Sequence, residues 1–152
     1  MTLVGVVIES ASDEALVQGT IEVLEQMKID YEVRAISAHR TPERVQEYAV
    51  TARDRGIEVL ISASGGSAAL AGVLASWTTI PVIGVPLAYS TLNGWDSLLA
   101  TVQMPEGIPV ACMAVGESGA RNAAFFAAEI LGLSHEEIRQ AYEDYRKQLR
   151  DR

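Results

Sequence analysis

The segment Val59-Leu-Ile-Ser-Ala-Ser-Gly-Gly-Ser-Ala-Ala-Leu-Ala-Gly-Val-Leu-Ala-Ser-Trp-Thr-Thr-Ile-Pro-Val-Ile-Gly-Val85 decides the fold. It belongs to a run from Val59 to Trp95 that contains no charged residue. A run of this length could span a membrane, which takes about 20 apolar residues. Gly65-Gly66, Pro81 and Pro86 interrupt it, however, and leave pieces of strand or short-helix length. The run therefore predicts a buried strand, a helix and a second buried strand.

The same alternation extends over the whole chain. Short apolar or β-branched runs predict five strands, at residues 3–8, 31–36, 59–63, 81–85 and 110–115. Helical periodicity predicts six helices, at residues 13–27, 42–55, 68–76, 94–102, 119–131 and 134–150. The strands are nearly continuous in apolar character, which is typical of burial on both faces of a parallel sheet. Strands that alternate with helices in this way predict an α/β fold.

The composition indicates the class of protein. With 49% hydrophobic residues among 152, we expect a single domain over residues 1–152 with a sizeable core. The 12 Lys and Arg against 20 Asp and Glu give a net charge of −8, which disfavours a nucleic-acid partner because phosphate backbones need a basic surface. The first residues lack the basic flank and cleavage site of a secretory signal. The single cysteine, Cys112, has no internal partner and fits a buried hydrophobic position, so we expect a cytoplasmic protein without a membrane partner.

The last predicted helix differs from the others. Ser134-His135-Glu136-Glu137 has the spacing of a capping box. Behind it, an apolar stripe of Ile138, Tyr142, Tyr145 and Leu149 runs along an otherwise strongly charged segment. We expect residues 134–152 to form a terminal helix that packs on its own domain or on a neighbouring subunit.

Three loops that follow predicted strands are rich in small polar residues. They read Glu9-Ser10-Ala11-Ser12-Asp13, Ser37-Ala38-His39-Arg40-Thr41-Pro42 and Ser64-Gly65-Gly66-Ser67. Ligands of an open parallel sheet bind beyond the carboxyl ends of its strands, so these loops are the candidate site.

Each loop supports a chemical and a purely structural interpretation. Hydroxyl and N–H groups before a helix suit an anion, although Ser12 or Asp13 also fits a simple N-cap. Arg40 can hold a phosphate and His39 can move a proton near neutral pH, although both also fit a solvated loop. Gly65-Gly66 lets the backbone approach a ligand closely, although such a pair is more often a turn.

Several other kinds of site lack their sequence motifs. The sequence has no G-x-G-x-x-G, no G-x-x-x-x-G-K-[ST] and no G-x-S-x-G, which disfavours dinucleotide binding, P-loop nucleotide binding and serine hydrolysis. It also has no Cys/His cluster with ligand spacing, and His135 belongs to the capping box, so we expect no metal site.

Taken together, the loops resemble those of the phosphoribosylaminoimidazole carboxylase catalytic subunit family, the N5-carboxyaminoimidazole ribonucleotide mutases of purine biosynthesis. The resemblance runs from about Val4 to Leu131. It rests on Ser10-x-Ser12-Asp13, Ser37-Ala-His-Arg-Thr-Pro42, Ser64-Gly65-Gly66, Gly84-Val85-Pro86, Leu92-Asn93-Gly94-x-Asp96-Ser97-Leu98-Leu99, and Val102-Gln-Met-Pro105 with Gly107-Ile-Pro-Val110.

The resemblance implies a three-layer α/β/α sandwich with a five-stranded parallel, flavodoxin-like sheet and an extra C-terminal helix. It also implies a homo-octamer with active sites near subunit contacts and no metal or organic cofactor. The reaction moves a carboxylate from the exocyclic amine of an aminoimidazole ribonucleotide to ring carbon 4.

The resemblance also assigns roles to residues. His39 would carry the proton, and Ser10, Asp13 and Arg40 would hold the ribose phosphate end. The expected substrate-binding set is completed by Ser12, Ser37, Ala38, Ser64, Gly65 and Gly66. The run from Val59 to Trp95 would supply walls of an uncharged pocket that retains carbon dioxide.

Two positions depart from the family pattern inside the expected site. Glu9 stands where the family has glycine, and Ala69 stands where it has a second active-site histidine. Three functions therefore stay open: the mutase, a relative recruited to another nucleotide or heteroaromatic carboxylate, and a silent nucleotide-binding or assembly paralogue. Retention of His39 with Arg40 disfavours the silent paralogue. The blocks at Leu92–Leu99 and Gln103–Pro105 look more like the mutase branch than the direct carboxylase branch.

Overall fold

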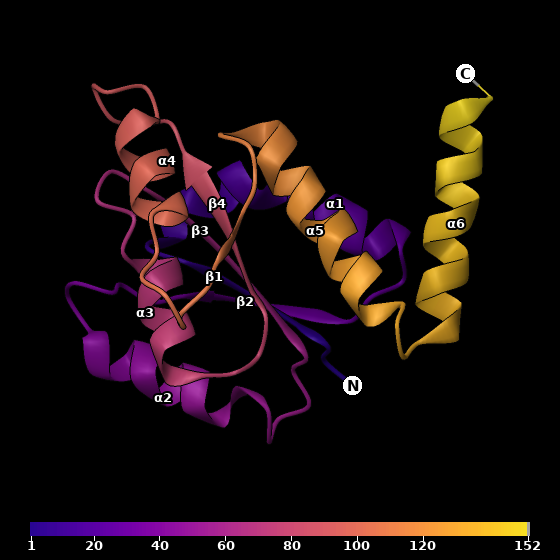
Figure 1. Cartoon of the computed structure of the whole chain (residues 1–152), viewed down its shortest axis with the longest axis horizontal. Helices are drawn as coiled ribbons and strands as arrows, with labels where there is room; N and C mark the ends of the chain where they lie inside the picture. The colour runs from indigo at the N-terminus through magenta and orange to yellow at the C-terminus, as the bar shows by residue number, and fades with distance from the viewer. Residues whose placement is uncertain (152) are drawn as a thin grey trace.

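The computed structural model describes residues 1–151, and a five-stranded parallel sheet with the strand order β2-β1-β3-β4-β5 lies at its centre (Figure 1). The strands are β1 (Val4–Ile8), β2 (Tyr31–Ala35), β3 (Val59–Gly65), β4 (Val82–Leu87) and β5 (Ala111–Cys112). A 3₁₀ helix, η1 (Ala11–Val17), precedes α1 (Gln18–Gln26), and the other helices are α2 (Pro42–Ala52), α3 (Leu70–Trp77), α4 (Trp95–Val102), α5 (Glu117–Leu131) and α6 (Glu136–Arg150). The flavodoxin-like α/β fold is confirmed.

Helices cover both faces of the sheet, because successive strand side chains point to opposite sides. On one face, α1 and α5 pack over a core that includes Val6 and Ile61. On the other face, α2 and α3 pack over Val7 and Leu60, and α4 lies on the same side (Figure 1). The central strands β1, β3 and β4 are buried along their whole length, as their apolar runs predicted.

The edge strands differ from the prediction of full burial. Strand β2 is only partly buried and carries Glu32 and Arg34, because it has a neighbour on one side alone. Charged side chains on such an edge discourage pairing with another chain. Strand β5 is also partly buried and is reduced to Ala111–Cys112. Its predicted extent, residues 110–115, was too long.

The terminal helix α6 packs on its own domain along one face. The ring of Phe125 in α5 stacks on Tyr145 with centroids 4.6 Å apart and lies 5.7 Å from Tyr142. The predicted capping box is wrong: the N-cap is His135, which makes no side-chain cap bond. Its Nε2 instead lies 2.9 Å from Oε2 of Glu58, the residue before β3. A contact with a distant part of the chain therefore replaces the local cap. Contact between α6 and a neighbouring subunit stays a prediction.

No helix within the described residues 1–151 is both long and apolar enough to cross a bilayer.

Candidate active site

The loops that follow β1, β2, β3 and β4 meet at the carboxyl edge of the sheet and line an open cavity of about 650 Å³. This edge includes the point between β1 and β3 where the strand order reverses, which is where doubly wound folds bind ligands. The predicted residues that line the cavity are Glu9, Ser10, Ser12, Asp13, Ser37, His39, Arg40, Gly65 and Gly66. Ala38, Ser64 and Ala69 are not among its lining residues. Ala38 and Ser64 are buried beside it, and Ala69 is the N-cap of α3.

The first loop turns sharply after β1. Ser10 caps η1, and its Oγ accepts hydrogen bonds from the Ser12 N–H at 3.4 Å and the Ser12 hydroxyl at 3.0 Å. The Ser10 carbonyl accepts from the Asp13 N–H at 2.9 Å. This turn brings Asp13 back toward the sheet, where the residue is 7% exposed. Its Oδ2 is buried without a hydrogen-bond partner among residues 1–151, which leaves this acceptor unsatisfied.

The second loop is held by its backbone and presents two side chains. Ser37 Oγ accepts from the Arg40 N–H at 3.2 Å, and the Ser37 carbonyl accepts from the Thr41 N–H at 3.0 Å. Thr41 also donates its hydroxyl to the Ser37 carbonyl, so it makes no cap bond to α2. His39 and Arg40 are exposed on this fixed loop. The loop can therefore offer a proton carrier and a cation without losing its own shape.

The third loop depends on a residue from the fourth. Gly65 N–H donates to the hydroxyl of Tyr89 at 3.2 Å, and a Cβ on Gly65 would lie 2.6 Å from the Tyr89 ring. A larger residue at this position would therefore have to displace the aromatic ring that lies over the backbone. Burial raises the pKa of the Tyr89 phenol, and the Asp13 carboxylate raises it further. The phenol therefore stays protonated and can donate to a ligand.

Tyr89, Leu16 and Ser67 line the cavity and were missed as site residues by sequence reasoning. The one available signal was that the fourth predicted strand ends at the same edge as the first three. Tyr89 belongs to the loop after that strand.

The charge distribution of the cavity differs from the expected uncharged pocket. The charge-free run supplies one wall, with Gly65, Gly66 and Tyr89. The opposite walls carry the carboxylates of Glu9 and Asp13 and the guanidinium of Arg40. An anionic ligand here depends on Arg40, N–H groups and hydroxyls for attraction.

Glu9, the departure at the end of β1, lines the cavity and is also engaged with the protein. Its Oε2 accepts a hydrogen bond from the Ala38 N–H at 3.2 Å. The side chain therefore joins the loop after β1 to the loop that carries His39.

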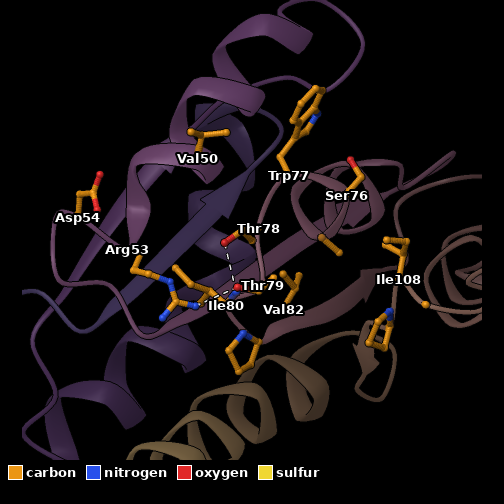
Figure 2. Close-up of a pocket in the computed structure, with 14 residues that line it drawn as sticks. Val50, Arg53, Asp54, Ser76, Trp77, Thr78, Thr79, Ile80, Val82 and Ile108 are labelled. Carbon is orange, nitrogen blue, oxygen red and sulfur yellow. Dashed lines mark hydrogen bonds between the residues drawn. The ribbon is translucent and has the colours of Figure 1, made fainter.

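A second cavity, of about 820 Å³, lies at the other end of the sheet, between α2, α3 and the segments that lead into β4 and β5 (Figure 2). Arg53 donates to the Thr79 hydroxyl at 3.1 Å on its wall, and Trp77 flanks it. It contains none of the predicted site residues. Among residues 1–151 no group of three or more His, Cys, Asp or Glu side chains could hold a metal ion.

Comparison with known proteins points to one family. A sequence model described as AIR carboxylase matches residues 3–152. A Pyrococcus abyssi protein named N5-carboxyaminoimidazole ribonucleotide mutase is 53% identical over 99% of this chain and 85% of its own length. A protein of the same name from Saccharolobus solfataricus is 47% identical over 99% of this chain and 94% of its own length. The crystal structure of Treponema denticola PurE matches with a TM-score of 0.86 and 26% identity, over 98% of this chain and 92% of that one.

Proposed function

This chain belongs to the AIR carboxylase family, and on that premise we propose that it is an N5-carboxyaminoimidazole ribonucleotide mutase of purine biosynthesis. The observation that carries the proposal is one cavity that His39, Arg40 and Asp13 line together. It occurs in a chain that is 46% to 53% identical, over at least 89% of its length, to proteins bearing that name.

The proposed reaction needs one proton carrier. His39 gives a proton to the exocyclic nitrogen as the bond between that nitrogen and the carboxyl carbon breaks, and the bonding electrons stay on nitrogen. The products of this step are carbon dioxide and the free amine. Ring carbon 4 then forms a bond to carbon dioxide, and His39 takes up the proton which that carbon loses. The histidine ends in its starting state, so the isomerisation needs no other acid or base.

The remaining residues hold the reactants together. We assign the ribose phosphate end to Arg40, Ser10 and Asp13, with Ser12, Ser37, Gly65 and Gly66 beside them. Retention of carbon dioxide near carbon 4 raises its effective concentration, which supplies much of the rate in a reaction of this kind. Gly66, together with Gly65 and the Tyr89 ring that lies over it, gives the ligand a wall without competing charges.

We further propose a cytoplasmic homo-octamer whose subunits complete one another's sites. His39 and Arg40 are exposed in the single chain, so a neighbouring subunit can cover them. Helix α4 presents an apolar face made by Trp95, Leu99 and Val102, with Trp95 67% exposed. Exposed apolar faces of this kind mark subunit contacts. The faces of α6 that do not pack on α5 are available to a neighbour as well.

The test is turnover by the purified protein. It should interconvert the two carboxylated aminoimidazole ribonucleotides, and His39→Asn should lower kcat by about 10²- to 10⁴-fold with little change in ligand affinity. His135→Asn is the matched control, because the other histidine pairs with Glu58 and does not line the cavity. Absence of turnover by the folded, oligomeric wild type would overturn the proposal.

A further inference from the structure

The hydrogen-bond ladder between β1 and β2 ends next to the site. In this parallel pair Ile8 lies opposite Ala35, and the Ile36 N–H donates to the Ile8 carbonyl at 2.8 Å. Parallel strands bond through every second residue of each strand. The next step of the ladder would thus join the Ala38 N–H to the carbonyl of Ser10.

That carbonyl is already engaged. The chain turns at Ser10 to enter η1, and the Ser10 carbonyl accepts from the Asp13 N–H at 2.9 Å. The Ala38 N–H is left without its regular partner, on a residue that is only 6% exposed. Glu9 Oε2 accepts this hydrogen at 3.2 Å. A side-chain oxygen therefore extends the ladder one step beyond the strand.

We infer that Glu9 is a positioning residue for His39, an inference that rests on the proposed function. His39 lies between Ala38 and Arg40, and the backbone N–H group of each neighbour is hydrogen-bonded to a side chain. Glu9 holds the Ala38 N–H on one side, and Ser37 Oγ holds the Arg40 N–H on the other. Glycine at position 9, the residue usual in the family, has no side chain to take this place.

The acceptor oxygen of Glu9 is what positions the loop, and its negative charge is a side effect. The charge faces a cavity that takes an anionic ligand, so it opposes binding. Glutamine has the same acceptor oxygen without the charge, whereas alanine has neither. The two substitutions therefore separate positioning from charge.

The experiment compares Glu9→Ala and Glu9→Gln with wild type and with Glu14→Ala. Glu14 is an exposed acid of η1 that does not line the cavity, so Glu14→Ala removes the same charge nearby and should leave kcat and KM unchanged. Glu9→Ala should lower kcat about tenfold without raising KM, because a proton carrier displaced by a fraction of an ångström loses rate. Glu9→Gln should keep kcat within about twofold and lower KM. Wild-type kcat in Glu9→Ala, or equal losses in both variants, would overturn the inference.

Amide hydrogen exchange provides a readout that does not depend on turnover. The Ala38 amide should exchange at least about tenfold faster in Glu9→Ala than in wild type, and at the wild-type rate in Glu9→Gln. Unchanged exchange in Glu9→Ala would contradict the hydrogen bond even in an active enzyme. A wild type without turnover would instead refute the proposed function, and the exchange rates would still decide whether Glu9 holds the loop.

Discussion

Asp13→Asn should stabilise the protein and weaken ligand binding at the same time. Asp13 is 7% exposed, and its Oδ2 has no hydrogen-bond partner in the described part of the chain. A buried acceptor in this condition costs about 1–3 kcal/mol of stability. A charged group in this position costs more than a neutral one. Asparagine has the same shape and still leaves an unpaired polar group there, but it removes the additional cost of the charge. It also removes an acid from the first turn of η1, which costs about 0.3–1 kcal/mol.

The net gain in the free energy of unfolding is therefore at most about 1 kcal/mol, or roughly 2–4 °C in Tm for a chain of this size. The binding effect has the opposite sign. A hydrogen bond from a ligand to this carboxylate contributes about 1.5–3 kcal/mol. Its loss should raise Kd for the ribonucleotide about 10- to 150-fold.

Urea unfolding at one fixed protein concentration measures the first effect, since the stability of an oligomer depends on concentration. Calorimetric titration with the ribonucleotide product measures the second. Glu14→Gln is the matched control, because Glu14 is the exposed acid of the same first turn of η1: it should lose about 0.3–1 kcal/mol of stability and leave the affinity unchanged. Destabilisation of Asp13→Asn together with unchanged affinity would refute the assignment of Oδ2 as a ligand acceptor.

Other substitutions test the loop, the sheet edge and the subunit contact. Gly65→Ala would place a Cβ 2.6 Å from the ring of Tyr89, so it should cost about 1–3 kcal/mol in urea unfolding and weaken ligand binding; unchanged stability would contradict the ring position. Burial raises the pKa of Glu32, but hydrogen bonds from Arg55 and the Tyr48 hydroxyl have the larger effect and hold the pKa of this carboxyl below its usual value. The folded-state pKa is depressed, so the stabilisation of wild type relative to Glu32→Gln should be full above about pH 5 and fade as the pH falls below about 4; a pH-independent difference would refute it. Trp95→Asp should convert the oligomer to smaller species in light scattering, and an intact octamer would rule out α4 as a contact.

The fold was predictable because its central strands are specified locally. Val59–Gly65 and Val82–Leu87 are apolar runs bounded by glycine or proline, and both became fully buried strands. The candidate site followed from the same pattern, since parallel strands bring all their carboxyl ends to one edge. His39 and Asp13, far apart in sequence, were predicted together for that reason and line one cavity.

Features that depend on a partner distant in sequence escaped prediction. The residues next to Tyr89 in the sequence do not reveal its place in the site, because its ring packs over Gly65 in another loop. Thr41 and Ser134 have the spacing of helix caps, yet neither makes a cap bond. The Thr41 hydroxyl donates instead to the Ser37 carbonyl. Such hydroxyls bond to whichever group the tertiary structure presents, so spacing alone does not determine their partner.

The role of Glu9, a departure from the family pattern, depends on how the chain turns after β1. From the sequence, Glu9 is a carboxylate beside a proposed anion site, and repulsion of the ligand is its expected effect. In the structure, the turn at Ser10 withdraws the carbonyl that the Ala38 amide would otherwise bond, and a buried amide must find another acceptor. The turn that forms the proposed anion-binding loop therefore also leaves the Ala38 amide in need of the acceptor that Glu9 provides. A glycine at this position would leave the amide free for water or for the ligand, so the residue at position 9 determines whether the loop of His39 is fixed before the ligand arrives or by it.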